Sequence, residues 1–162
     1  MTTEEQLKAL VEKTHITDML IQYFAADDDK CLDMEIVKAT FTSDAKIIRP
    51  DDAEIVGQEN ILDGHLNSFA RFTATHHVIT NVIVNINNDS ATLRSNIIAN
   101  HVWADNKNNP SLYNKHFLAD GVFSAKAIKV DDHWRISELK NRVIWRTGDG
   151  MKEILNFERS KD

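Results

Sequence analysis

Residues 76–103, HHVITNVIVNINNDSATLRSNIIANHVW, decide the fold class, because their apolar and polar side chains alternate. A period of two places successive side chains on opposite faces of a β-strand. The polar run Asn87-Asn88-Asp89 divides the stretch into two arms, which predicts a β-hairpin. One face of the second arm is expected to carry Ala91, Leu93, Ser95, Ile97, Ala99, His101 and Trp103. In the first arm, the even positions from His76 to Ile86 form the apolar face.

The chain after this hairpin continues in the same pattern. Alternation predicts strands over Phe117–Lys129 and Trp134–Trp145, joined by a turn at Asp131-Asp132. A polar loop is expected over Ala104–Pro110, and a short tail helix is expected after Gly148-Asp149-Gly150.

The chain before residue 73 shows the helical period of 3.6 instead. Helices are expected over Glu4–Ala26, Leu32–Phe41 and Gln58–Phe72, with a brief strand over Ala45–Arg49. The first helix is expected to open with a capping box at Thr3 and Gln6 and to break near Thr14. Helices followed by long antiparallel strands indicate the α+β class. Three or four helices against one strongly bent sheet would enclose a cavity for a small molecule.

Composition limits the class of protein. The 162 residues suit one domain, expected over 1–162, and 42% apolar residues are ordinary for a globular chain. A net charge of −6 argues against a nucleic-acid binder. The single cysteine, Cys31, excludes a disulfide framework and a multi-cysteine zinc site. The start MTTEEQLKAL does not resemble a signal peptide, and the chain has no apolar run of about 18 residues, so we expect a cytoplasmic protein without a membrane span.

Histidine and aspartate are the residues left to carry chemistry, since the chain has no phosphate-binding loop, dinucleotide fingerprint or G-x-S-x-G elbow. His76, His77 and His101 lie on predicted strands, and Asp27-Asp28-Asp29 closes the first helix. A histidine within hydrogen-bond reach of a carboxylate is a common general base, because the carboxylate orients the ring and supports its charged form.

Simpler interpretations stand beside this one. Three aspartates after a helix can form a solvated turn, and a histidine on a strand can serve packing alone. The other histidines are assigned to packing or surface: His15, His65, His116 and His133. Convergence of His76, His77, His101 and Asp28 could bind a metal, but no fixed ligand spacing such as H-x-x-x-H is present, so we expect no metal and no cofactor.

Several motifs together resemble the SnoaL-like proteins of the nuclear transport factor 2-like superfamily. Ile16 to Asp28 resembles their I-x-D-x(4)-Y-x(4)-D opening, and Phe41–Ala45 resembles F-T-x-D-A. Thr75–Asn81 resembles T-x-H-x-x-x-N, Asn88–Ala91 stands for G-D-x-A, and Asp132–Ile136 resembles D-G-x-W-R-I. The resemblance implies a cone-shaped α+β barrel, in which the helices pack on a strongly curved, mostly antiparallel sheet.

The resemblance also implies a catalytic pair without a cofactor. The aspartate of the family falls on Asp28 and the histidine on His77, whereas strict alternation favours His76, and a bulge would reconcile the two. Tyr23 matches a tyrosine that lines the cavity, and His101 stands where some dehydratases place a second histidine.

Two functions are compatible with these residues. The first is a lyase or isomerase, dehydratase-like or cyclase-like, in which His77 removes a proton from a small, largely apolar carbonyl or hydroxy compound. Asp28 would orient His77, Tyr23 and His101 would donate hydrogen bonds to the reacting oxygen, and Arg142 is a weaker candidate for that role. The second is a non-catalytic binding or dimerisation module, in which the outer face of the sheet and the tryptophans Trp103 and Trp145 could pair two subunits. A homodimer is expected in either case, with a trimer as the alternative.

Overall fold

The computed structural model describes residues 2–104, 115–152 and 154. The helices are α1 (Thr3–Asp28), α2 (Met34–Thr40) and α3 (Gln58–Phe69). The strands are β1 (Phe41–Ile48), β2 (Glu54–Val56), β3 (Phe72–Asn87), β4 (Ser90–Trp103), β5 (His116–Val130) and β6 (His133–Gly148). Among the described helices, none combines the length and apolar character that crossing a bilayer requires.

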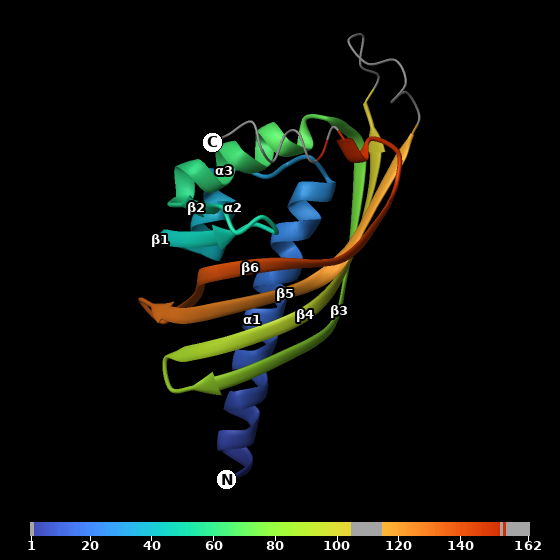
Figure 1. Ribbon diagram of the computed structural model, residues 1–162. Coiled ribbons are helices and arrows are strands. Elements are labelled where there is room, and N and C mark those ends of the chain that lie inside the picture. The colour runs from blue at the N-terminus through green and yellow to red at the C-terminus, as the bar shows by residue number, and fades with distance from the viewer. Residues whose placement is uncertain (1, 105–114, 153, 155–162) are drawn as a thin grey trace.

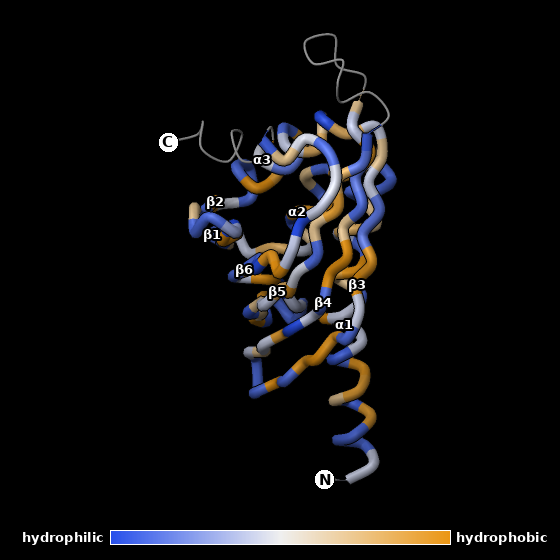
Figure 2. The backbone as a smooth tube through the Cα atoms, turned by 45° about the vertical axis from the view of Figure 1, so that its right-hand side comes forward, coloured by the Kyte–Doolittle hydropathy of each residue, from blue (hydrophilic) through white to orange (hydrophobic). Residues whose placement is uncertain are grey.

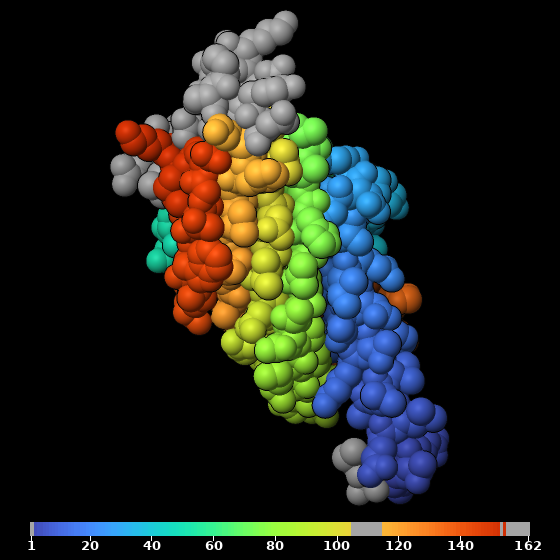
Figure 3. Space-filling model, turned by 90° about the vertical axis from the view of Figure 1, so that its right-hand side faces the viewer, coloured from blue at the N-terminus to red at the C-terminus, as the bar shows by residue number. Residues whose placement is uncertain are grey.

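The strands form one open, strongly bent sheet in the order β2-β1-β6-β5-β4-β3, and the helices cover its concave face (Figure 1). Every pairing is antiparallel except that of β1 with β6, so the sheet is mixed. The α+β class and the cone-like arrangement of helices on a curved sheet are confirmed. Figure 3 shows the outer face, where β3, β4, β5 and β6 lie side by side with no described helix across them.

Several expected boundaries move for local reasons. The capping box of α1 uses Thr2 and Glu5, one residue earlier than expected, with the Thr2 hydroxyl accepting from the Glu5 N–H at 3.2 Å. Thr14 does not break α1, and its hydroxyl donates to the Leu10 carbonyl at 3.0 Å within the continuous helix. The second helix begins only at Met34, since Asp33 caps it through the Ile36 N–H at 2.9 Å.

Other boundaries depend on the sheet. Strand β1 is longer than expected, α3 stops at Phe69 to let β3 begin, and β2 was not expected at all. The expected polar loop over 104–110 and the tail helix after residue 150 fall almost wholly outside the described residues.

The inner face of β4 is the one that alternation predicts: the side chains from Ala91 to Trp103 at odd positions are all buried. Strand β3 differs, because its register with β4 shifts between Thr80 and Ile83. Asn81 adopts φ +52° there, a left-handed conformation that asparagine tolerates better than most residues. The extra residue of a β-bulge reverses which side chains face inward.

Because of this bulge, odd-numbered side chains of β3 face inward before it and even-numbered side chains face inward after it. Val82, Val84 and Ile86 pack into the core on one side of it. On the other side Thr75 is buried and His77 faces inward, while His76 is exposed. Uniform alternation from residue 76 to 86 is therefore wrong, and the bulge reconciles the pattern with His77.

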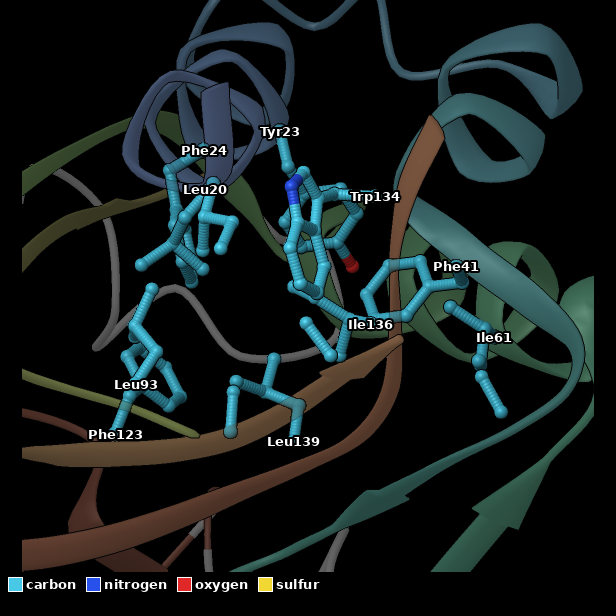
Figure 4. Packing of buried hydrophobic residues seen from close by; sticks show 14 of the residues in the cluster. Leu20, Tyr23, Phe24, Phe41, Ile61, Leu93, Phe123, Trp134, Ile136 and Leu139 are labelled. Carbon is cyan, nitrogen blue, oxygen red and sulfur yellow. The ribbon is translucent and has the colours of Figure 1, made fainter. Parts of the chain in front are cut away.

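The main core lies between α1 and the sheet. Figure 4 shows side chains of α1, among them Leu20 and Phe24, facing Leu93, Phe123 and Leu139 from three strands. Each such side chain contributes about 1.5–3 kcal/mol by leaving water. The N-terminal part of α1 extends past the sheet (Figure 2), so its apolar stripe is only partly used: Leu7 and Leu10 are exposed. The sheet thus packs tightly on the C-terminal half of α1, which holds the candidate residues.

A second, smaller cluster closes the other end of the sheet. Phe72, Trp103, Phe117 and Ile154 are buried against one another. Trp103, named above as a residue that could pair two subunits, is only 3% exposed, and its indole N–H donates to the Asp149 carbonyl at 3.0 Å. Trp145 does lie at the surface, 47% exposed. The two clusters leave space between them.

Candidate functional site

A cavity of about 240 Å³ occupies this space, between α1, α3 and the inner face of the sheet. Its walls are mostly apolar and aromatic, including Phe24, Phe69, Phe72 and Phe117. The sheet floor carries small residues at Ala99, Ala119 and Gly121, which leave room above the strands. A mostly apolar cavity with a few polar groups is typical of a small-molecule site.

Asp28 and His77 meet at the wall of this cavity. Oδ1 of Asp28 lies 2.7 Å from Nδ1 of His77, and the His77 side chain is only 3% exposed. The Asp28 carboxylate also accepts the Thr75 hydroxyl at 2.8 Å and the His77 backbone N–H at 2.7 Å. Both carboxylate oxygens are therefore fixed, and the last turn of α1 is joined to β3.

These hydrogen bonds determine the protonation of the pair. Burial raises the pKa of Asp28, but the His77 side chain, the His77 backbone N–H and the Thr75 hydroxyl outweigh burial and lower the pKa to about 2. The carboxylate is ionised at neutral pH and can only accept, so the hydrogen between the two side chains belongs to Nδ1 of His77. The other ring nitrogen, Nε2, is then the atom that can take a proton.

Asp27 makes a second, looser contact. It is 4% exposed, and its Oδ2 lies 3.4 Å from Nε2 of His65 and 3.9 Å from Nδ1 of His77. His65 in turn holds the Tyr23 hydroxyl at 2.6 Å through Nδ1, and its ring stacks on Phe69 at 4.7 Å. The solvated-turn interpretation is therefore wrong for Asp27 and Asp28, although Asp29 is exposed. Sequence reasoning had also left His65 outside the site.

Tyr23 lines the cavity, but its hydroxyl contacts His65. Burial, and then the neighbouring Asp27, raise the pKa of Tyr23 well above its ordinary value, so the hydroxyl keeps its proton. In this arrangement the hydroxyl orients His65 rather than pointing a donor at a ligand. The expected role of Tyr23 as a donor to the substrate stays a prediction, and in this structure the hydroxyl contacts His65.

His101 also lines the cavity, with its ring 5.8 Å from that of His77. Its Nδ1 lies 3.1 Å from the Phe117 carbonyl, which can only accept, so Nδ1 carries the hydrogen. Burial lowers the pKa of His101 to about 4, a shift that the Phe117 bond only partly opposes. His101 is therefore neutral at pH 7, and its Nε2 offers an acceptor to a ligand where a donor was expected.

Arg142 does not join the site. It is exposed on the outer face, while Asn141, Val143 and Arg146 of the same strand line the cavity. The register of β5 with β6 passes from Gly121–Val143 to Asp120–Trp145, so β6 has one extra residue there. Odd-numbered side chains of β6 therefore face the cavity before this bulge, and even-numbered ones face it after the bulge. Gly121 permits the close approach of β6, since a Cβ there would lie 2.5 Å from the Arg142 carbonyl oxygen.

The remaining histidines lie away from the cavity. His15, His116 and His133 are exposed, as expected. Asp27, Asp28 and His77 each offer one ligand atom, and these atoms lie within 4.8 Å of one another. A divalent cation could bridge them only by separating Nδ1 of His77 from Asp28. His76 and His101, named above as potential ligands, are not in this group.

Comparison with known proteins gives the same fold. A family model described as SnoaL-like domain matches residues 8–140. No curated protein sequence matches the chain. Among solved structures, the Kfla4162 protein from Kribbella flavida has a TM-score of 0.77 at 22% identity, over 86% of this chain and 95% of that one.

Two further structures carry names that describe an activity. A putative scytalone dehydratase from Novosphingobium aromaticivorans has a TM-score of 0.73 at 20% identity, over 86% of this chain and 88% of its own. The hexachlorocyclohexane dehydrochlorinase LinA-type3 from Novosphingobium barchaimii has a TM-score of 0.75 at 18% identity, over 88% of this chain and 93% of its own. At these identities the likeness shows the fold.

Proposed function

The chain belongs to the SnoaL-like domain family, and from that premise we propose that it is a cofactor-independent lyase or isomerase with His77 as general base. The contact between Asp28 and His77 carries this proposal, because the two atoms lie 2.7 Å apart at the wall of a small cavity. Relatives of the same fold named as a dehydratase and a dehydrochlorinase support an elimination or isomerisation.

The proposed reaction begins with proton removal. Nε2 of His77 takes a proton from a carbon next to a carbonyl group, and the electron pair of that bond moves toward the carbonyl oxygen. The ionised Asp28 stabilises the resulting imidazolium through Nδ1. The imidazolium then returns the proton, to another carbon in an isomerisation or to a departing hydroxyl group in a dehydration, which releases water. No redox partner is needed.

His101 and Asp27 take supporting roles in this scheme. The acceptor Nε2 of His101 can hold a hydroxyl group of the substrate near His77, since the two rings are 5.8 Å apart. Asp27 lies 3.9 Å from Nδ1 of His77 and 3.4 Å from Nε2 of His65, so it stands between the two histidines.

Proton exchange tests the proposal without knowledge of the natural substrate. Small ketones and hydroxy-ketones are incubated with the protein in D2O, and loss of the α-proton signal is followed by NMR. His77→Gln should slow exchange by about 10²–10⁴-fold, the usual contribution of a general base. His76→Gln is the matched control: it changes an exposed neighbour and should keep the wild-type rate. Equal rates in the two variants would refute the role of His77.

The alternative function is that of a non-catalytic binding module of the same fold. The hydrogen bond between the Tyr23 hydroxyl and Nδ1 of His65 favours it, because two polar groups of the cavity there satisfy each other without a ligand. Binding of the same ketones without any exchange would support this alternative.

We further propose one domain over residues 1–162, acting as a cytoplasmic homodimer with a trimer as the alternative. Exposed apolar side chains on β3, β4 and β6, namely Ile83, Ile98 and Trp145, support pairing through the outer face of the sheet. Analytical ultracentrifugation of the wild type and of Trp145→Lys measures the assembly, which the charged variant should weaken.

A further inference from the structure

The cavity has a cationic side that the proposed proton transfer does not use. Arg49, Arg71 and Arg146 line it, and within the described residues no lysine does. Arg49 is held by Asp51 at 3.1 Å, and Arg71 stacks near the rings of Phe72 and Trp103 at 5.5 and 5.9 Å. Asp120 lines the same cavity and Asp51 holds Arg49, so the cavity combines both charges, and the position of Arg146 relative to His77 carries the argument.

Arg146 has a defined place relative to His77. His77 on β3 pairs with Ala99 on β4, Ala99 pairs with Ala119 on β5, and Ala119 pairs with Arg146 on β6. All four residues line the cavity, so they form one row across its floor. Adjacent strands lie about 4.8 Å apart, which puts the backbones of His77 and Arg146 about 14 Å apart along the sheet.

The middle of this row is open. Ala99 and Ala119 carry only methyl groups, so a ligand can lie over them with one end at His77 and the other toward the guanidinium of Arg146. A guanidinium binds a planar carboxylate with two parallel hydrogen bonds.

We propose that Arg146 binds a carboxylate group of the substrate, so that the natural substrate is a small organic acid. Its carboxylate lies at the β6 side of the cavity, and its reacting carbon lies beside His77. The identity of the reaction rests on the proposed function, whereas the carboxylate site rests on the row of residues alone.

Binding of benzoate and of its neutral isostere benzamide tests the carboxylate site directly. Both are titrated into the wild type, Arg146→Gln and Arg142→Gln by calorimetry. Arg142→Gln is the matched control, because it removes the same charge four residues away on the outer face. The wild type and Arg142→Gln should bind benzoate about tenfold or more tightly than benzamide, and Arg146→Gln should lose this preference.

The proposal is overturned if the wild type shows no preference for benzoate, including the case in which neither probe binds. It is also overturned if Arg146→Gln keeps the preference or if Arg142→Gln loses it equally. Should Arg146→Gln fail to fold, Arg146→Lys replaces it: lysine keeps the charge but not the paired hydrogen bonds, so benzoate binding should weaken while benzamide binding stays the same.

His77→Gln separates this proposal from the proposed reaction. It should slow proton exchange by about 10²–10⁴-fold and leave benzoate binding within about twofold of the wild type, because the carboxylate is held at the opposite end of the row. A failed exchange assay with intact benzoate preference would remove only the catalytic proposal. Intact exchange without benzoate preference would remove only the carboxylate site.

Discussion

Asp27 and Asp28 are neighbours at the end of α1, yet the structure treats them differently. Asp28 is fixed by three hydrogen bonds from Thr75 and His77, whereas Asp27 approaches His65 only to 3.4 Å. Successive residues of a helix point about 100° apart, so Asp28 meets β3 while Asp27 is directed toward α3. Because of this rotation, Asp28 contacts His77 and Asp27 lies nearest to His65.

The position of both aspartates is unfavourable for the helix itself. A carboxylate at a helix C-terminus opposes the helix dipole at a cost of about 0.3–1 kcal/mol, and the last turn of α1 carries no basic residue. For Asp28, hydrogen bonds from β3 offset this cost.

Replacing the two aspartates separately should give the largest difference. Asp28→Asn removes the charge that supports the His77 imidazolium and allows the wrong ring tautomer, so proton exchange should fall by about 10²-fold or more. Asp27→Asn leaves the 2.7 Å contact intact and should cost about tenfold or less. NMR exchange rates measure both, and circular dichroism verifies folding. A larger loss in Asp27→Asn would reverse the assignment.

The pH dependence of stability should show the contributions of Asp28 and His101 in two different pH ranges. The pKa of Asp28 is about 2 in the folded protein, against about 3.9 in an unfolded chain, so the unfolded state takes up the proton first. The stability that Asp28 contributes is present above pH 4 and is lost as pH falls toward 2. His101, with a pKa of about 4 against about 6.5 when unfolded, removes stability earlier, as pH falls from 6.5 to 4.

Urea unfolding at a series of pH values, followed by tryptophan fluorescence, measures these two steps. Asp28→Asn should abolish the lower step and leave the upper one. Asp29→Asn, a change at the exposed neighbour, should leave both steps in place. Identical curves for all three proteins would contradict the hydrogen-bond network drawn for Asp28.

The smallest effect on proton exchange is expected from the contact between Tyr23 and His65, which lies beside Asp27. Tyr23→Phe removes the hydroxyl that contacts His65 and should lower the free energy of unfolding by about 1 kcal/mol, the typical value of one hydrogen bond. Exchange should change only a few-fold, because the pair of Asp28 and His77 is untouched. A double-mutant cycle with His65→Gln measures the coupling, and a coupling of zero would show that the 2.6 Å contact contributes nothing.

Local pattern was sufficient for much of the architecture. The hairpin around Asn87-Asn88-Asp89, the buried face of β4, and the order of helices before strands follow from side-chain periodicity and turn chemistry, which depend on neighbouring residues. The resemblance to the family also predicted Asp28 and His77 as a pair, and their side chains lie 2.7 Å apart.

Tertiary structure alone decided which side chains share the cavity. Bulges in β3 and β6 reverse the inward parity, so His77 replaces His76 and Arg146 replaces Arg142, and a bulge depends on the register of a partner strand. Trp103 is buried because Phe72, Phe117 and Ile154 pack against it. His65 joined the site because its position on α3 brings it to Tyr23, 42 residues earlier in the chain. Periodicity within one segment carries no information about such contacts, since they arise when distant segments pack together.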